Sequence, residues 1–381
     1  MNSELDSKTQ EDTNAREYES TKNRLFVIQI LYLFALLAIF LFFGFSQSLA
    51  NNLVSHFGSD FWFITNISYI ALVILGISVF LFPFSYYSGY VLESYYNLSN
   101  QSPGSWGVDY TKSLLLDVII LSFLINVIYI FLRLLPEVWW LVGTGFYLLF
   151  SLVFSFITPI LIFPIFYNLE PLEDSNLEEK VSNVIKSAGI KISGVYRWGL
   201  ADKTKTANAA FVGIGRTKRI VLSDTLLDNY SDNEILAVVA HEVGHCKNYD
   251  IMRLIIVNTL LSFTGFYLAD LFLQFSMKWV NLNSIYDISG LPLLFFSVMV
   301  FSIISMPIFN GYSRKREFAA DAYVVDASGT AENLISALNK LSKQNLSVRD
   351  PNKWIEFFLH SHPSVKKRVE YAHARASKNY S

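Results

Sequence analysis

The sequence predicts a mainly α-helical, multi-pass membrane protein that carries a polar α+β part, and three observations support this fold class. The 381 residues are 52% hydrophobic and only 16% charged, whereas globular domains are about 25% charged. Six apolar runs are long enough to cross a bilayer, which takes about 20 residues as a helix. Charged residues return between and after these runs, in segments long enough to fold as a polar part.

Four predicted spans precede the central polar segment and two follow it. The six cover residues 25–45, 64–86, 114–135, 138–167, 254–275 and 291–309. The fourth is the longest and contains Pro159 and Pro164, which favours one tilted or kinked span over two short ones. Asp117 and Asp270 lie in or near spans, where they face either an internal cavity or the bilayer interface.

The positions of the basic residues predict the orientation in the membrane. With the N-terminus in the cytoplasm, the loops on the other side hold only Arg133 and Lys278 of the 30 lysines and arginines. Basic residues concentrate in cytoplasmic loops, so we expect both termini and the polar part to be cytoplasmic. The membrane would be that of the endoplasmic reticulum in a eukaryote and the inner membrane in a bacterium.

Charge and cysteine content exclude two classes of protein. The 30 basic residues against 32 acidic ones give a net charge of −2, which is no basic excess, and we expect no nucleic-acid partner. The single cysteine, Cys246, excludes an internal disulfide framework and a zinc site made only of cysteines.

The chain divides into five segments. They are a polar tail at 1–24, four spans in 25–168, a polar segment at 169–250, two spans in 251–310 and a second polar segment at 311–381. In the polar segments we expect helices at 176–188, 314–327, 331–342 and 364–376, and strands at 192–198, 207–214 and 219–223, the last two joined as a hairpin. Ser231 and Glu234 form a capping box, which predicts a helix that continues to about Cys246.

The central motif is His241-Glu242-Val243-Gly244-His245, an H-E-x-x-H pattern on the helix that the capping box predicts. Residues i and i+4 share a helix face, so His241 and His245 can bind one zinc ion through ring nitrogens. Zinc lowers the pKa of a bound water to about 7, and Glu242 can then take its proton. The alternative is a chance match on a polar helix, and the independently predicted helix favours the metal site.

A third metal ligand is expected from Glu317, which lies four residues before Asp321 on one helix face. Glu317 can bind zinc while Asp321 accepts an N–H from a ligand histidine. Taken alone, this pair just beyond a span is more typical of a solvated charged face. Cys246 points about 100° away from His245 on the helix and is not expected to bind the metal. His362, followed by Pro363, either stabilises an oxyanion or belongs to a capping turn.

Taken together, these motifs resemble the type I CaaX prenyl proteases, which are integral-membrane zinc metalloendopeptidases. The resemblance rests on H-E-V-G-H, two hydrophobic spans, E-F-A-A-D, and S-H-P with Arg368 six residues on, and on the segments 208–213 and 218–227. It covers most of the chain after about Phe82. It implies a gluzincin-like α+β zinc-protease domain built from the central loop and the C-terminal segment. Members of the family have seven spans around a chamber, and only six are counted here.

The resemblance also implies roles for individual residues. One Zn²⁺ per chain would be held by His241, His245 and Glu317, with Glu242 as the general base. Asp321 would be an outer partner or a proton donor, and His362 and Arg368 would surround the cleavage site. The strand that holds Asn208, Ala209 and Ala210 would pair with the substrate backbone, as an edge strand can do with any extended peptide. The implied partners are a peptide or protein substrate, with or without a prenyl group, and the lipid bilayer.

Two other functions remain open at this point. One is a quality-control protease like the shorter heat-shock membrane metallopeptidases, which share the zinc motif but lack the S-H-P segment as it stands here. The other is a membrane scaffold with a relic site, and it is disfavoured because the general base and all three candidate ligands are present.

Overall fold

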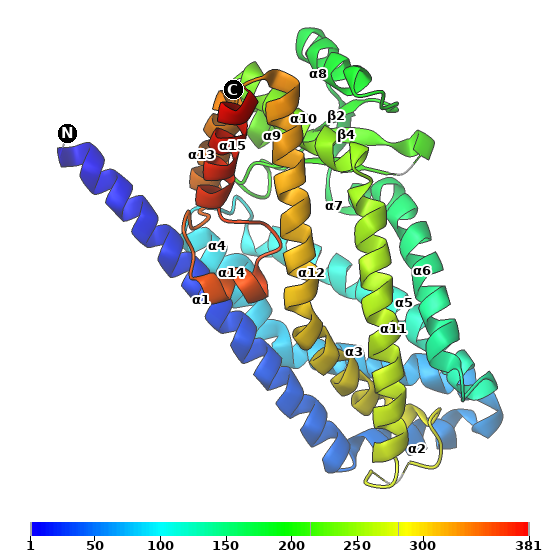
Figure 1. Cartoon of the computed structure of the whole chain (residues 1–381). Helices are drawn as coiled ribbons and strands as arrows, with labels where there is room; N and C mark the ends of the chain where they lie inside the picture. Colours follow the sequence, from blue (N-terminus) through cyan, green and yellow to red (C-terminus); the bar gives the residue numbers. More distant parts are fainter. Residues whose placement is uncertain (1, 214, 281, 380–381) are drawn as a thin grey trace.

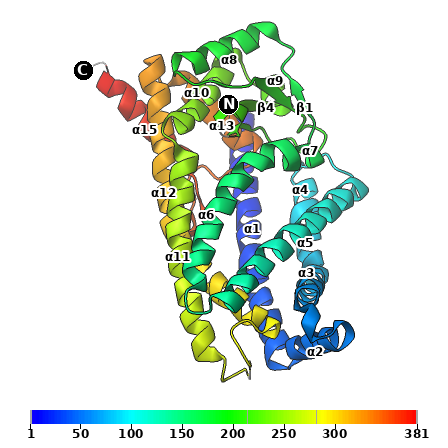
Figure 2. The same cartoon turned by 90° about the vertical axis from the view of Figure 1, so that its right-hand side faces the viewer.

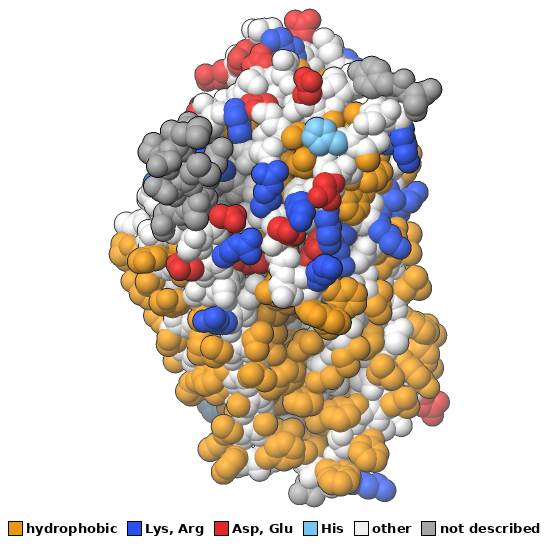
Figure 3. All heavy atoms as spheres, turned by 60° about the vertical axis from the view of Figure 1, so that its left-hand side comes forward, with side chains coloured by type: hydrophobic (Ala, Val, Ile, Leu, Met, Phe, Trp, Pro, Cys, Tyr) orange, Lys and Arg blue, Asp and Glu red, His pale blue; other side chains and the backbone are white. Residues whose placement is uncertain are grey.

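Membrane-spanning helices and a polar head (residues 169–250 and 311–379) make up the structure, a computed structural model that describes residues 2–213, 215–280 and 282–379. Within these residues, six helices are long and apolar enough to cross a membrane, which confirms the predicted number. The sheet and the shorter helices of the head gather at one end of the long helices (Figures 1 and 2). Figure 3 shows the same division on one face, where charged side chains lie above a broad hydrophobic region.

The membrane part consists of long helices and short helical turns. In chain order these are α1 (Asn2–Phe42), α2 (Phe45–Phe57), η1 (Ser59–Phe61), α3 (Trp62–Tyr86), η2 (Tyr87–Val91), α4 (Leu92–Tyr95), α5 (Pro103–Leu134), α6 (Trp139–Ile157), η3 (Thr158–Ile162), α7 (Phe163–Phe166), α11 (Asp250–Ser276), η5 (Ile288–Gly290) and α12 (Leu291–Ser328). The fourth predicted span corresponds to α6, η3 and α7, which follow one another directly. Its irregular turn, η3, contains Pro159, and a proline has no amide N–H to continue the regular helical bonding.

Two helices are longer than the sequence pattern predicts. α1 joins the polar tail predicted at 1–24 to the first span, and α12 joins the sixth span to the helix predicted at 314–327. Lysine and arginine are good helix formers, so the polarity changes at the membrane surface while the helix continues. α12 therefore connects the membrane part to the head as one continuous helix.

The head combines a small sheet with helices. Its elements are β1 (Leu169–Pro171), α8 (Ser175–Ser187), β2 (Val195–Trp198), β3 (Ala209–Val212), η4 (Gly215–Thr217), β4 (Arg219–Ser223), α9 (Asp224–Asn229), α10 (Asp232–Lys247), α13 (Glu332–Gln344), α14 (Lys353–Leu359) and α15 (Val365–Asn379). The strand order is β1-β2-β4-β3, with β2 and β4 parallel and the other two pairs antiparallel. The predicted hairpin is β3–β4, with Ala209 opposite Leu222. β3 pairs only with β4, so it is an edge strand of this sheet.

The rotation of α10 is set by its buried apolar face. The helix begins at the predicted capping box, in which Ser231 and Glu234 satisfy each other's backbone N–H groups. Ile235, Val239 and Val243 recur every four residues and are buried in a core shared with α8 and β4. With that face turned to the core, the two histidines of the motif face away from the sheet and toward α12.

The two acidic residues of the spans have different environments. Asp270 is buried and accepts a hydrogen bond from the indole N–H of Trp139 at 2.6 Å and from Gln274 at 2.8 Å. Asp117 is exposed on the surface of α5. Asp270 is thus satisfied by neighbouring helices, as buried polar groups of membrane helices usually are.

Candidate metal centre and active site

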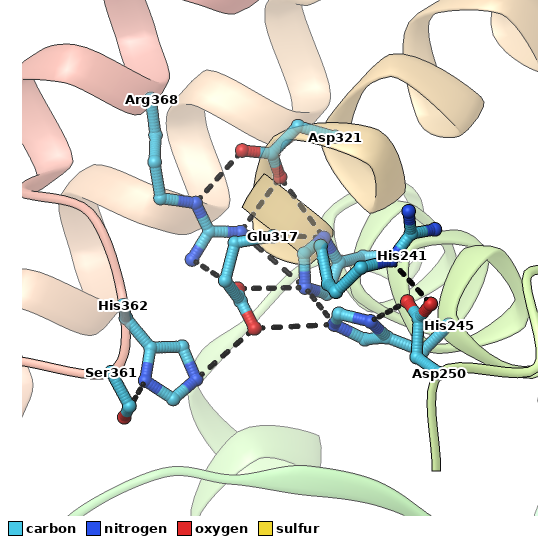
Figure 4. Close-up of polar contacts among 9 residues, drawn as sticks. His241, His245, Asp250, Glu317, Asp321, Ser361, His362 and Arg368 are labelled. Carbon is cyan, nitrogen blue, oxygen red and sulfur yellow. Dashed lines mark hydrogen bonds and ion pairs between the residues drawn. The ribbon is translucent and has the colours of Figure 1, made fainter. Parts of the chain in front are cut away.

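His241, His245 and Glu317 come together where α10 crosses α12 (Figure 4). The Nε2 atoms of the two histidines are 3.1 Å apart. One carboxylate oxygen of Glu317 lies 3.3 Å from His245 Nε2 and the other lies 3.4 Å from His241 Nε2. One atom from each of the three side chains lies within 4.8 Å of the others, a spacing that could hold a metal ion.

The close crossing of the two helices depends on Gly244, inside the motif itself. A Cβ atom on this residue would lie 3.0 Å from the Cα of Ala320 and 3.2 Å from its carbonyl oxygen. A side chain cannot be accommodated there without moving the backbone of α12. Glycine at 244 and alanine at 320 therefore bring Glu317, one turn earlier on α12, within reach of the histidines.

The three side chains fit a divalent cation. Oε2 of Glu317 is buried and makes only long contacts, with His241 at 3.4 Å and Arg368 at 3.5 Å, and neither contact is a hydrogen bond. A buried carboxylate oxygen without a hydrogen bond is costly. Burial and Arg368 lower the pKa of His241, but the neighbouring carboxylates of Asp321 and Glu317 raise it to about 9 overall. The pocket thus favours positive charge between these groups, and two nitrogens with one carboxylate oxygen are a common ligand set for zinc in hydrolytic enzymes.

Each candidate histidine ligand contacts a carboxylate through Nδ1, the ring nitrogen that faces away from the metal position, and each carboxylate accepts a hydrogen bond from an arginine. Asp321 lies one turn after Glu317 on α12 and its Oδ1 is 2.9 Å from His241 Nδ1. Arg368 from α15 donates to both oxygens of Asp321, at 2.8 and 2.7 Å. These contacts fix the ring of His241 so that Nε2 points to the metal position, as outer partners of metal-binding histidines usually do.

The matching support for His245 was not expected from the sequence. Asp250, at the start of α11, has its Oδ2 2.9 Å from His245 Nδ1, and Arg316 donates to its other oxygen at 2.5 Å. Tyr249 adopts a left-handed backbone conformation with φ of 55°, which turns the chain between α10 and α11. An acid five residues after an H-E-x-x-H motif was the available signal, but helical spacing alone does not bring it back to the histidine.

Glu242 lies between the candidate metal position and the edge of the sheet. It lines the cavity described below and accepts a hydrogen bond from the backbone N–H of Phe211 in β3. Burial raises the pKa of its carboxyl group, while the two neighbouring histidines lower it. A carboxylate whose pKa is raised in this way is suited to take and return a proton.

The loop before α15 brings His362 to the same cluster. Its Nε2 is 3.3 Å from Oε1 of Glu317 and its side chain is 65% exposed, so it lines the open side of the site. Ser361 lies 3.0 Å from its Nδ1. Cys246 lies outside the group of His241, His245 and Glu317, and its sulfur accepts a hydrogen bond from Lys218 at 3.3 Å.

A cavity of about 950 Å³ opens over the candidate metal position. Asn208 and Ala209 line it together with His241, Glu242 and Glu317. The side chain of Ala210 does not line it and packs instead against the cluster around Trp198. Of the three residues expected to bind substrate, two therefore line the cavity, and the third packs against the cluster around Trp198.

Two protein-family models match this chain. The model of peptidase family M48 matches residues 171–376, and that of the CAAX prenyl protease N-terminal segment, described as five membrane helices, matches residues 3–168. An uncharacterized metalloprotease of Bacillus subtilis is 29% identical over 94% of this chain and 84% of its own length. A CAAX prenyl protease 1 homolog of Arabidopsis thaliana is 31% identical over 75% of this chain and 68% of its own length.

A solved structure has the same fold. The crystal structure of Ste24p from S. mikatae matches 95% of this chain and 88% of its own, with a TM-score of 0.83 and 24% identity. The family resemblance inferred from the motifs is confirmed by these matches. Because the M48 family model covers more than half of the chain, the protein belongs to peptidase family M48 and is a multi-pass membrane metalloprotease.

Proposed function

We propose that the protein is a zinc endopeptidase that cleaves peptide bonds near the C-termini of membrane-associated peptides or proteins. The observation that carries this proposal is the cluster of His241, His245 and Glu317 with Glu242 beside it in a cavity of about 950 Å³. The relatives named CAAX prenyl proteases support the choice of C-terminal, membrane-attached substrates. We also propose that the head and both termini are cytoplasmic, as the basic residues predict.

His241, His245 and Glu317 would hold the zinc ion, which when bound would polarise the scissile carbonyl group and lower the pKa of a water molecule. Glu242 accepts the proton from the attacking water and returns it to the leaving amine. His362, on the open side of the site, donates to the oxyanion that develops on the substrate. Asp321 is wholly buried between Arg368 and His241, which supports a role in orienting His241 rather than in donating a proton to substrate.

The substrate backbone is proposed to extend along β3. A strand with one unpaired edge can bind any extended peptide through main-chain hydrogen bonds. The segment of Asn208, Ala209 and Ala210 would lie along the substrate, but the backbone N–H and C=O of Asn208 already bond with Ser223. In an antiparallel pair the hydrogen-bonded residues alternate, so the backbone groups of Ala210 point toward Val221 in β4. The main-chain bond to substrate would therefore come from the C=O of Ala209, beside the N–H of Phe211 that reaches Glu242. This arrangement brings the scissile bond beside the general base, and it sets no strong side-chain requirement.

The direct test replaces Glu242 with glutamine and follows peptide cleavage and zinc content together. We expect Glu242→Gln to abolish cleavage and to leave about one zinc ion per chain, because the amide cannot accept a proton while the ligands are unchanged. Glu179→Gln, on an exposed position of α8, is the matched control and keeps full activity. Cleavage by Glu242→Gln at the wild-type rate would refute the mechanism.

The peptides in this test should be matched pairs with and without a farnesyl group, and the cleavage sites should be mapped by mass spectrometry. Cleavage near the C-terminus that is faster on the farnesylated peptide supports a prenylated substrate. Preference for unfolded membrane proteins over both peptides would instead support the quality-control hypothesis.

A further inference from the structure

The short helix α14 exposes large aromatic side chains on one face. Trp354 is 71% exposed, Phe357 46% and Phe358 42%. These positions are spaced i, i+3 and i+4, so they lie on one face of the helix. Aromatic residues usually supply much of a protein's buried apolar surface, and a continuous exposed group of three indicates a surface that contacts something other than water.

The opposite face of α14 carries a buried charge. Glu356 is only 4% exposed, and its carboxylate accepts hydrogen bonds from the backbone N–H of Ser364 at 3.0 Å and from Lys367 at 2.5 Å. The acidic residue thus faces the protein while the aromatic residues face outward. This is the reverse of an ordinary surface helix, and it is the arrangement expected where the outer environment is apolar.

The contacts of α14 put it at the level where the spans end. Asn310 of α12 donates to the carbonyl of Phe358 at 2.7 Å, and Arg314 donates to the carbonyls of Glu356 and His360 at 2.8 and 2.6 Å. Asn310 comes directly after residue 309, where the sixth predicted span ends. The exposed, apolar Ile304 and Ile308 precede it on the same helix.

Leu359, the last residue of α14, reaches further toward the membrane part. It lines a cavity of about 500 Å³ together with Phe26 of α1 and Met306 of α12, both inside predicted spans. Figure 1 shows α14 between α1 and α12 below the rest of the head. The end of α14 therefore lies between α1 and α12 where the apolar segments of these two helices meet the polar head.

We propose that α14 is an interfacial helix whose aromatic face lies in the lipid leaflet next to the polar head. Tryptophan and phenylalanine on a short amphipathic helix favour the boundary between headgroups and acyl chains. Arg349 and Lys353, both exposed, flank the start of the helix and can contact anionic headgroups. Lipid is the occupant because α14 is hydrogen-bonded to α12 where the sixth span ends, next to the exposed, apolar Ile304 and Ile308.

This docking has a consequence for the active site, and that consequence alone rests on the proposed protease function. The chain passes from Leu359 through His360 and Ser361 to His362, which contacts Glu317. A lipid-bound α14 therefore holds the open side of the active site close to the membrane surface. Substrates anchored in the same leaflet would reach the site more often than substrates in free solution.

The test uses a cysteine-specific fluorophore, since Cys246 is the only cysteine of the chain. In a Cys246→Ala background, the label is attached to Trp354→Cys, to Ile304→Cys in the span and to Glu370→Cys on the exposed side of α15. The proteins are reconstituted in nanodiscs with lipids spin-labelled near the headgroup. We expect the label at 354 to lose most of its fluorescence to the spin-labelled lipid and to be shielded from aqueous iodide. The label at 370 should behave in the opposite way.

Two results would overturn the proposal. Quenching at 354 by iodide as strong as at 370, with no effect of spin-labelled lipid, would show that the helix lies in water. Shielding at 354 from both quenchers would show a protein contact, such as a second copy of the chain. The label at 304, inside the span, is the control for membrane contact: spin-labelled lipid should quench it and iodide should not.

The functional consequence is tested with the double variant Trp354→Glu/Phe357→Glu, with Asn333→Glu on the exposed side of α13 as the control. We expect kcat/KM for a lipid-anchored peptide to fall about tenfold, which corresponds to the loss of modest apolar burial. The value for a water-soluble peptide with the same scissile bond should not change. Equal loss on both peptides, or none on either, would contradict the role in substrate delivery. Failure of the wild type to cleave any peptide would refute the proposed function without affecting the fluorescence result.

Discussion

The two sides of the candidate metal centre are built alike from different parts of the chain. His241 is backed by Asp321 and Arg368, and His245 by Asp250 and Arg316. In each case the carboxylate contacts Nδ1 of the ring and leaves Nε2 for the metal position.

The two supports differ in how they connect to the rest of the site. Arg368 contacts Asp321 and also approaches Oε2 of Glu317 at 3.5 Å, so this pair joins a candidate ligand to its outer partner. For Arg316, the described contacts of its guanidinium group are with Asp250 only. The His241 side is therefore a connected network, whereas the His245 side is a simple pair. We infer that a substitution of Arg368 or Asp321 also disturbs the candidate ligand Glu317, whereas a substitution of Arg316 or Asp250 affects only the support of His245.

Loss of Arg368 should have the largest effect on stability. Arg368→Ala leaves the buried Asp321 without its cation, and removing one partner of a buried ion pair costs about 3–5 kcal/mol. Arg316→Ala should lower the free energy of unfolding by less than Arg368→Ala, because only one carboxylate, that of Asp250, loses its arginine. Arg375→Ala on the same helix removes an exposed pair with Asp326 and should cost about 0–1 kcal/mol. Thermal unfolding of the purified variants measures these differences, and equal destabilisation by the two buried arginines would contradict the comparison.

Replacement of the outer carboxylates should weaken zinc binding. Asp321→Asn and Asp250→Asn keep the shape of each side chain but remove the charge that fixes the histidine ring, and such changes lower metal affinity about 10–100-fold. Competition with a chelator measures the affinity. We expect the larger loss for Asp321→Asn, with Asp326→Asn unchanged as the control. No change for Asp250→Asn would show that this pair does not support the metal.

A smaller effect on stability is expected from Glu234, at the start of α10, the helix that carries both histidines. Burial raises the pKa of Glu234, but hydrogen bonds from Lys340, Ser336 and Ser231 lower it to about 2 overall. A carboxylate with a lowered pKa stabilises the fold fully above about pH 4.5, and this contribution is lost as the pH falls toward 2.

Glu234→Gln should therefore lower the free energy of unfolding by about 1–2 kcal/mol at pH 7, as for other helix caps. The difference from the wild type should shrink as the pH falls below 4.5. Glu332→Gln, in the first turn of α13, is the control. A difference that stays constant down to pH 2 would show that the charge of Glu234 does not matter.

Much of the fold could be predicted because its signals are local. The six spans follow from length and hydropathy alone, and the capping box of Ser231 and Glu234 marks the start of the zinc-motif helix. Glu317 and Asp321 share a helix face, so the sequence predicts that both approach the metal site together. The exact ends of α1 and α12 could not be predicted, because a change from apolar to charged residues does not stop a helix.

The features that were missed depend on tertiary contacts. β1 has three residues and pairs antiparallel with β2, and so short a strand has no periodicity to detect. Asp250 reaches His245 only because Tyr249 turns the chain. Gly244 is needed because its neighbour in the fold is the backbone of Ala320, which is 76 positions away in the sequence. Such contacts require the packing of α10 on α12, which no single motif specifies.

The central claim is that His241, His245 and Glu317 together bind one zinc ion. Its most direct test is the zinc content of the purified protein, measured by mass spectrometry after dialysis for the wild type and for Glu317→Gln. We predict about one zinc ion per chain for the wild type and almost none for the variant, since two histidines alone leave the metal with too few ligands. Equal zinc content in the two proteins would contradict the account.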